Sequence, residues 1–289
     1  MVSAWRGVPT ALGEAAYDAA MELSGRHVVV TGAAGGIGEA LARGFHAAGA
    51  RVVLSDVQAH AVGEVAGALD TMRPGSATAV AADISTEAGN VDLVAAAEAA
   101  FGPIDLFFAN AGVGIGHDPM SPEPEWDLAF AVNVHAHRWA ARALLPGWLA
   151  RGEGYFCSTA SAAGLLSQIG SAPYTLTKHA AVAFAEWLSI TYGGRGLKVS
   201  CLCPQGVNTA MLRAGDDPSV GISSAVVRSA GTVLEPSDVA EVVLAAIHDE
   251  TFLILPHPEV LTYLQRKAAD PARWLAGMRK LQARMADPA

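Results

Sequence analysis

The chain has 289 residues and a formal net charge of −9, with 52% hydrophobic and 16% charged residues. This length suits one large domain or two small ones, and the apolar content excludes an intrinsically disordered chain. The acidic balance argues against a nucleic-acid-binding surface, and the longest stretch without a charge, residues 154–177, is too rich in Ser and Thr to span a membrane.

Residues 1–22 precede the first predicted strand and are weakly amphipathic, so we expect a surface helix or an N-terminal extension there. Arg6, Pro9, Glu14 and Asp18 interrupt any apolar segment of the signal-peptide type. We therefore predict a cytoplasmic protein.

Seven short apolar runs alternate with helix-length segments from residue 26 onward. Several runs are apolar at consecutive positions, which is typical of strands buried on both faces of a parallel sheet. We predict a single α/β domain over residues 23–256, with a Rossmann-type doubly wound parallel sheet of seven strands. The predicted strands cover residues 27–30, 51–55, 77–81, 104–108, 154–158, 197–202 and 251–255.

A glycine-rich turn, TGAAGGIG at residues 31–38, lies between the first strand and a predicted helix over residues 39–48. Glycines let the backbone approach a pyrophosphate, and the N–H groups at the start of the helix bind its charge. Asp56, at the end of the next strand, lies at the spacing from which a carboxylate reaches the ribose hydroxyls of adenosine. It would repel the 2′-phosphate of NADP, and neither Gly35 nor Val57 is basic, so NAD is the predicted cofactor.

Tyr174 and Lys178 lie one turn apart at the start of a predicted helix, with Ser171 as its N-cap. A nearby ammonium favours the phenolate, so we expect the pKa of Tyr174 to fall. The alternative is a surface tyrosine beside a solvated lysine. Ser161, just past the fifth strand, favours a site, because open α/β sheets bind ligands at the carboxyl ends of their strands.

Taken together, these motifs resemble the short-chain dehydrogenase/reductase family over residues 26 to about 256. Asn110-Ala111-Gly112 resembles a family motif in which Ala109 replaces the first Asn, and residues 204–209 resemble another with Gln205 interposed. The resemblance implies the catalytic residues Asn133, Ser161, Tyr174 and Lys178. It implies cofactor contacts from Gly32, Gly36, Ile37, Gly38, Asp56, Asp83, Ile84, Asn110, Ala111, Gly112, Tyr174, Lys178, Pro204, Gly206, Val207 and Thr209.

The resemblance also implies a reaction. Tyr174 would exchange a proton with the substrate oxygen, Ser161 would hydrogen-bond that oxygen, and Lys178 would bind the nicotinamide ribose. Asn133 would hold a water that links Lys178 to solvent. We predict an NAD(H)-dependent oxidoreductase that interconverts a secondary alcohol and its ketone. The alternatives are an NADP(H)-dependent carbonyl reductase and a nucleotide-binding protein without turnover.

Apolar residues are the candidates for the substrate pocket, and Arg213 is the only cation near them. This set predicts a hydrophobic or aromatic substrate. Its members are Val113, Ile115, Leu165, Leu166, Ile169, Met211 and Leu212.

No metal site is predicted. Cys157, Cys201 and Cys203 lie in apolar runs and are interpreted as structural. His135 and His137 lie two apart on a predicted helix, so they face different ways and are interpreted as ordinary helix-surface residues.

Two long predicted helices, residues 124–150 and 174–192, carry more apolar residues than one buried face needs. Residues 180–185 are apolar around more than a full turn, and Trp139 and Trp148 are candidate interface anchors. We predict a homotetramer with dimer contacts through these helices. A helical tail over residues 257–289 has one apolar face and must pack on its own subunit or on a neighbour.

Overall fold

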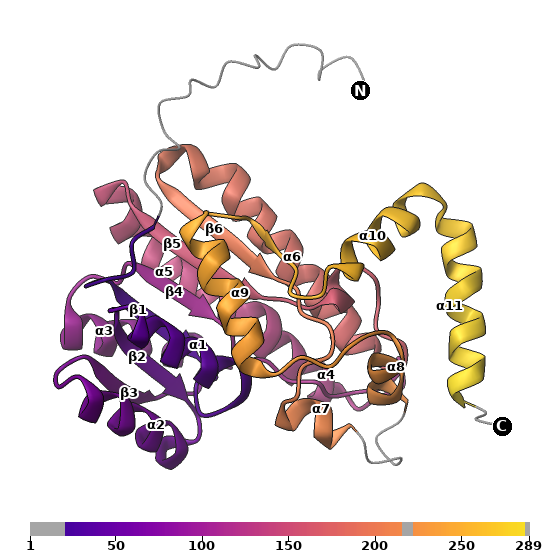
Figure 1. Cartoon of the computed structure of the whole chain (residues 1–289), viewed down its shortest axis with the longest axis horizontal. Helices are drawn as coiled ribbons and strands as arrows, with labels where there is room; N and C mark the ends of the chain where they lie inside the picture. The colour runs from indigo at the N-terminus through magenta and orange to yellow at the C-terminus, as the bar shows by residue number, and fades with distance from the viewer. Residues whose placement is uncertain (1–20, 216–221, 287–289) are drawn as a thin grey trace, which may run out of the picture.

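Seven parallel strands form one sheet in the order β3-β2-β1-β4-β5-β6-β7 (Figure 1). The structure, a computed structural model, describes residues 21–215 and 222–286. The chain winds outward from β1 to β3, then returns past β1 to β4 and continues to β7, which confirms the predicted doubly wound fold. The strands are β1 (His27–Thr31), β2 (Arg51–Asp56), β3 (Ala77–Ala81), β4 (Leu106–Ala109), β5 (Gly154–Thr159), β6 (Leu197–Leu202) and β7 (Leu253–Ile254).

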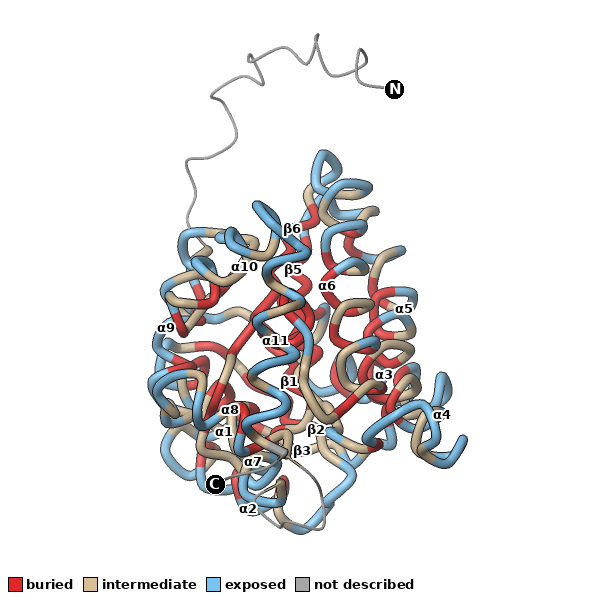
Figure 2. Tube along the Cα trace, turned by 90° about the vertical axis from the view of Figure 1, so that its right-hand side faces the viewer, coloured by how far each residue is buried: buried red, intermediate tan, exposed pale blue. Residues whose placement is uncertain are grey.

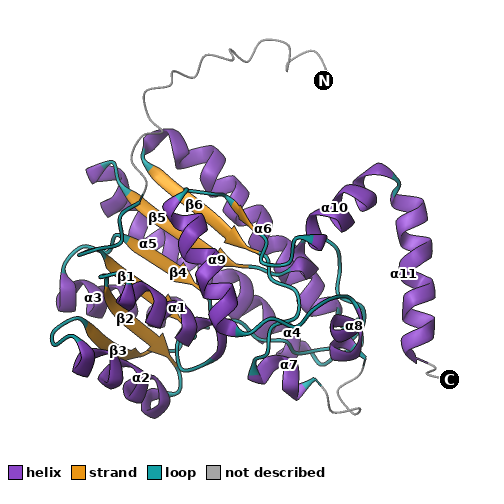
Figure 3. Cartoon of the chain, viewed as in Figure 1, coloured by secondary structure: helices purple, strands orange, loops and turns teal. Residues whose placement is uncertain are grey.

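The apolar strands are buried because helices cover both faces of the sheet (Figure 3). Val28 and Val30 face α1, α2 and α9, whereas Val29 faces α3, α5 and α6. The helices on the first face are α1 (Gly36–Ala47), α2 (Ala59–Met72) and α9 (Pro236–His248). Those on the second face are α3 (Glu87–Phe101), α5 (Ala136–Arg151) and α6 (Ala172–Tyr192).

Two elements differ from the prediction. The predicted helix over residues 124–150 is α4 (Glu123–Phe130), a π-helical turn (Ala131–His135) and then α5. The last strand is shorter than the predicted 251–255. It is only β7 (Leu253–Ile254), an edge strand that pairs with β6 at two positions. Short α7 (Ala210–Ala214) and α8 (Ser223–Ser229) lie in the connection between β6 and α9.

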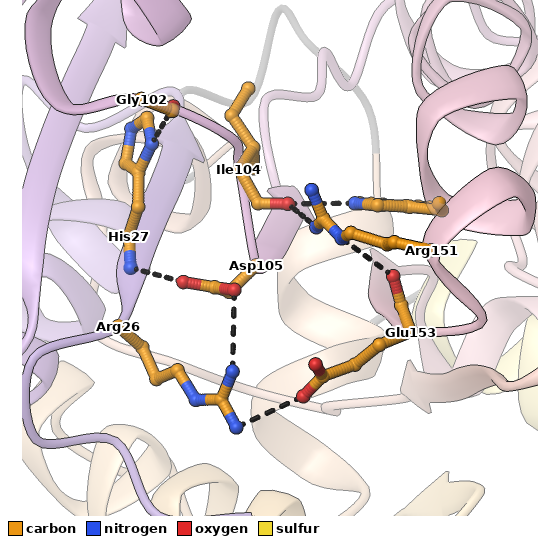
Figure 4. Close-up of polar contacts among 8 residues, drawn as sticks. Arg26, His27, Gly102, Ile104, Asp105, Arg151 and Glu153 are labelled. Carbon is orange, nitrogen blue, oxygen red and sulfur yellow. Dashed lines mark hydrogen bonds and ion pairs between the residues drawn. The ribbon is translucent and has the colours of Figure 1, made fainter.

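Polar contacts hold the amino ends of the central strands together, at the edge opposite the carboxyl ends (Figure 4). The guanidinium of Arg26 contacts the carboxylates of Asp105 at 3.3 Å and Glu153 at 2.9 Å. The backbone N–H of His27 donates to Asp105 over 2.8 Å, and its ring Nδ1 lies 2.8 Å from the carbonyl oxygen of Gly102. These contacts tie the amino ends of β1, β4 and β5 together, whereas open α/β sheets bind their ligands at the carboxyl ends of the strands.

The chain continues past the sheet into α10 (Glu259–Ala269) and α11 (Pro271–Ala286), which stand beside the body in Figure 1. Residues 271–285 of α11 are exposed or half-buried, in contrast to the buried interior of the sheet (Figure 2). At the other end, Met21 packs on the core below α1 and α9. The predicted helix before it lies outside the described residues, of which only residues 21 and 22 belong to the predicted extension.

Candidate active site

A cavity of about 1060 Å³ lies at the carboxyl ends of the strands. It is lined by the glycine-rich turn after β1, the loops after β2 to β6 and the first turns of α6. All the predicted site residues except Asn133 and Gly206 line it. The fold therefore brings into one place segments that are up to about 200 residues apart in the sequence, from Thr31 to Val227.

The glycine-rich turn forms one end of this cavity. Gly32 has φ +65°, and a Cβ there would lie 2.8 Å from the Cα of Ala111. A Cβ on Gly38 would lie 2.0 Å from the carbonyl oxygen of Gly32. Neither position has room for a side chain, so the turn packs closely on itself and on the loop after β4. Gly36, Ile37 and Gly38, at the start of α1, line the cavity, and the first N–H groups of a helix suit an anion such as a pyrophosphate.

Hydrogen bonds tie this turn to the loop after β4. The hydroxyl of Thr31 accepts from the backbone N–H groups of Asn110 at 2.9 Å and Ala111 at 3.0 Å. The side-chain amide of Asn110 donates back to the Thr31 carbonyl at 3.0 Å. The carbonyl oxygen of its side chain accepts from the Thr159 hydroxyl at 3.0 Å. The loop is held in place without the first Asn that Ala109 replaces.

Two carboxylates line the cavity beyond the turn. Asp56 accepts from the backbone N–H groups of Ala34 at 3.1 Å and Gln58 at 3.0 Å, which fixes its orientation after β2. Asp83, after β3, accepts from the N–H of Ser85 at 3.0 Å and from its hydroxyl at 2.6 Å. The N–H of Ala34 belongs to the glycine-rich turn and that of Gln58 to the loop after β2, so these two hydrogen bonds hold the Asp56 carboxylate beside the turn.

Tyr174 and Lys178 line the cavity from the first turns of α6. The helix begins at the N-cap Ser171, whose hydroxyl accepts from the Tyr174 N–H at 3.3 Å. The ammonium of Lys178 lies 5.6 Å from the centroid of the Tyr174 ring and donates to the Thr159 carbonyl at 3.0 Å. Ser161 is buried beside them and accepts from the Ala163 N–H at 3.1 Å.

Burial shifts both titrating groups toward their neutral forms. It lowers the pKa of Lys178 to about 8 from its usual 10.5. It also raises the pKa of Tyr174 above 10, and the hydrogen bond to Ser161 offsets only part of this rise. The expectation that the pKa of Tyr174 falls is wrong for this structure, because desolvation of the phenolate is the largest effect.

Asn133 lies behind the cavity wall, in the π-helical turn. Its side-chain oxygen accepts from the Val113 N–H at 2.9 Å, and its amide donates to the Val113 carbonyl at 2.9 Å and to Thr177 at 3.1 Å. A Cβ on Gly112 would lie 3.2 Å from both Asn133 Oδ1 and Lys178 Nζ. The Asn133 side chain therefore fixes the loop after β4 close to Lys178.

The segment after β6 is held by a residue that the sequence analysis missed. His257 is 2% exposed, and its Nδ1 accepts from the Gln205 N–H at 3.1 Å. Its Nε2 lies 3.1 Å from the Gly206 carbonyl and 3.2 Å from the Thr232 carbonyl, so Nε2 carries the proton and the ring is neutral. A single histidine between two prolines carries no motif that signals this role.

The apolar lining of the cavity agrees only in part with the predicted pocket. Val113, Ile115, Met211 and Leu212 line it, but Leu165, Leu166 and Ile169 do not. Leu165 and Leu166 instead pack with α10 in a small separate core. Lys178 is the only Lys or Arg in the lining drawn from residues 21–215 and 222–286. Arg213 lies outside it and donates to Asn208 at 2.8 Å.

Two further interpretations are wrong. His137 is 1% exposed and not on the surface, because its face of α5 packs on β5, where Nδ1 lies 2.9 Å from the Ser158 hydroxyl. Burial lowers the pKa of His137 to about 3. Trp148 is 2% exposed and donates to the Ile104 carbonyl at 2.7 Å, so it is a core residue and not an interface anchor.

The three cysteines are free and buried. Within the described part of the chain, no group of three or more His, Cys, Asp or Glu side chains is arranged to hold a metal ion. The search of these same residues also finds no helix long and apolar enough to cross a membrane.

The chain is similar to known proteins over most of its length. The profile of the family described as short chain dehydrogenase matches residues 26–218. A 1-deoxy-11-beta-hydroxypentalenate dehydrogenase of Streptomyces exfoliatus is 36% identical over 260 residues, 86% of this chain and 90% of that protein. Estradiol 17-beta-dehydrogenase 11 of Pongo abelii is 30% identical over 264 residues, 89% of this chain and 83% of that protein. A solved short chain dehydrogenase/reductase from Burkholderia phymatum in complex with NAD has a TM-score of 0.78 at 31% identity, covering 86% of this chain and 95% of that one.

Proposed function

The chain belongs to the short-chain dehydrogenase/reductase family and is an oxidoreductase, and from this premise we propose that it interconverts an apolar secondary alcohol and its ketone with NAD(H). The observation that carries the proposal is the single cavity that joins the glycine-rich turn to Tyr174, Ser161 and Lys178. The proposed domain is residues 23–256, with the tail of residues 257–289 added to it. The cytoplasmic location stays a prediction.

The residues around the turn fit a dinucleotide. Gly36, Ile37 and Gly38 line the cavity at the start of α1, where the first N–H groups of the helix would bind the pyrophosphate. Asp56 is oriented to accept hydrogen bonds from the adenosine ribose, and Asp83 lies further along the same wall. A nicotinamide dinucleotide held by these residues would supply the hydride acceptor for oxidation and the hydride donor for reduction.

Proton transfer is assigned to Tyr174. In oxidation its phenolate takes the proton of the alcohol hydroxyl as the carbinol carbon gives up its hydride, and in reduction its hydroxyl returns that proton. The hydrogen bond from Ser161 favours the phenolate and offsets part of the cost of its burial. When protonated, the ammonium of Lys178, 5.6 Å from the centroid of the Tyr174 ring, would favour it too. Ser161 also stabilises charge on the substrate oxygen.

The lining of the cavity supports an uncharged, apolar substrate. Val113, Ile115, Met211 and Leu212 line the same cavity as Tyr174, and among the residues the structure describes this lining offers no Lys or Arg besides Lys178. Estradiol, named for one relative, is a large apolar alcohol. The remaining candidates are an NADP(H)-dependent carbonyl reductase and a nucleotide-binding protein without turnover.

Incubation of the protein with NAD or NADP and a panel of alcohols tests the proposal, with the absorbance of the reduced nicotinamide as the readout. We expect turnover of alkyl and aryl carbinols with NAD. Preferred oxidation of a small hydroxy acid would contradict the substrate assignment. Preferred use of NADP would support the NADP(H)-dependent carbonyl reductase. No reaction with any alcohol would support the non-catalytic nucleotide-binding protein.

A homotetramer is proposed on the apolar outer face of α6. Leu176, Trp187 and Ile190 are 50%, 52% and 83% exposed there, and Ala183 lies among them. Such a stripe on a long helix suits close contact with a second copy across a twofold axis.

A further inference from the structure

A second cavity, of about 410 Å³, adjoins the catalytic cavity. His117, Gln168 and Ser171 line both cavities, so the two spaces adjoin at these three residues, and Ser171 is also the N-cap of the helix that carries Tyr174. The rest of the lining comes from the loop after β4, the loop before α6 and the inner side of α11. These residues are Asp118, Pro119, Ser167, Ile169, Gly170, Ala172, Trp274, Leu275, Met278 and Gln282.

The loop before α6, which supplies two of the shared residues, is held by hydrogen bonds of Gln168. The Gln168 N–H donates to the Thr175 hydroxyl at 2.8 Å, and its side-chain amide donates to the carbonyls of Ile169 at 3.1 Å and Ser223 at 3.2 Å. Ser167 has φ 135°, in a region that residues with a Cβ rarely adopt. Backbone strain of this kind concentrates at functional sites, and here it sits in the lining of the second cavity.

The helix α11 presents an apolar face to this loop. Trp274, Met278 and Leu281 follow the helical spacing and are half-buried. Arg273, Arg279, Lys280 and Arg284 are all exposed. A membrane-binding helix would need its apolar face outward and free, whereas Trp274 and Met278 of this face line the second cavity.

The tail is anchored on the segment that leads to Tyr174. The ammonium of Lys267, in α10, donates to the carbonyls of Leu165 at 2.7 Å and Leu166 at 3.2 Å. Trp274 packs on Tyr263, with the ring centroids 6.4 Å apart, at the edge of the small core around Leu166. The position of α11 over the loop is therefore set by contacts within one chain.

We propose that the second cavity is the outer part of the substrate site, which takes the distal end of a large, mainly hydrocarbon alcohol or ketone whose reacting oxygen lies at Tyr174. This inference rests on the proposed function for the reacting end. For the distal end it rests on the three residues that line both cavities and on the apolar side chains of α11 that line the second one. A small alcohol fills only the catalytic cavity, so α11 selects for size.

Binding to the full-length protein in complex with NADH tests this independently of turnover. The probes are cyclohexanone and androstan-3-one (androstanone below). In androstanone the same six-membered ring ketone belongs to a system with three further apolar rings. Met278→Trp fills the second cavity, and Arg279→Trp adds the same bulk one residue away at an exposed position. Calorimetry should give about a tenfold loss of androstanone affinity in Met278→Trp, and no comparable loss in Arg279→Trp. Cyclohexanone affinity should stay the same in both.

Unchanged NADH binding shows that a variant is folded. If Met278→Trp does not fold, Trp274→Ala, which removes one wall of the second cavity, should weaken androstanone and spare cyclohexanone. Equal effects on both ketones, no preference of the wild type for androstanone, or a loss of affinity accompanied by a change in oligomer mass would overturn the inference. Size-selective binding without turnover of any alcohol would instead refute the proposed function and leave the second site standing.

Discussion

Replacement of Asp56 should change which dinucleotide the protein prefers. Two backbone N–H groups at 3.0 and 3.1 Å hold its carboxylate beside the glycine-rich turn. In water, two unit charges about 4 Å apart interact by about 1 kcal/mol, and a 2′-phosphate carries about two charges. The repulsion of NADP is therefore about 2 kcal/mol, or about thirtyfold in kcat/KM. Asp56→Ala should reduce the ratio of kcat/KM for NAD to that for NADP by about this factor.

The assay measures kcat/KM for both cofactors with one apolar alcohol. Asp56→Asn removes the charge but keeps an acceptor for one of the two N–H groups, so it should shift the ratio with less damage to the NAD value. Asp83→Asn is the matched control, because this acid also lines the cavity and the family resemblance implies that it contacts the adenine, so its loss should affect both cofactors alike. Equal use of NAD and NADP by the wild type, or an unchanged ratio in Asp56→Ala, would refute the reasoning.

Three further predictions concern buried and exposed groups. Because burial lowers the pKa of His137 to about 3 from 6.5, only the unfolded chain gains a proton in that window and stability falls as the pH drops through it. His137→Gln should remove up to about 1.4 kcal/mol of this loss per pH unit, measured by denaturant titration, and equal slopes would contradict it. His257→Phe should cost about 1–3 kcal/mol of unfolding free energy and raise KM for NAD more than it lowers kcat, with partial rescue in His257→Gln. An unchanged KM would leave His257 a purely structural role. Ala183→Asp should shift the assembly to smaller species in light scattering, and a wild-type mass near 29.7 kDa would contradict the tetramer.

The sheet could be predicted because runs of consecutive apolar residues indicate strands that are buried on both faces. Val28, Val29 and Val30 are consecutive and all fully buried, as expected of a strand covered on both faces. The arrangement of the glycine-rich turn and of the Tyr174–Lys178 pair could also be predicted, because each depends on a short spacing in the sequence. Such patterns can be interpreted from the sequence because the residues that form them are only a few positions apart.

Long-range packing was not predictable in the same way. The sequence alone does not say which side of α5 faces the sheet, so the burial of His137 and Trp148 appears only in the fold. His257 contacts residues more than 20 positions away. Lys267 reaches Leu165 across 102 positions, which moves Leu165 and Leu166 from the predicted pocket into a core with α10.

The most direct test of the account is turnover by the wild type and by Tyr174→Phe under the same conditions. Each protein is incubated with NAD and an apolar secondary alcohol, and the absorbance of reduced nicotinamide is followed. The wild type should turn over, and Tyr174→Phe should lose about a hundredfold or more in kcat with NADH binding nearly unchanged, because only the proton-transferring hydroxyl is removed. A near-wild-type kcat in Tyr174→Phe would contradict the assignment of proton transfer to this residue.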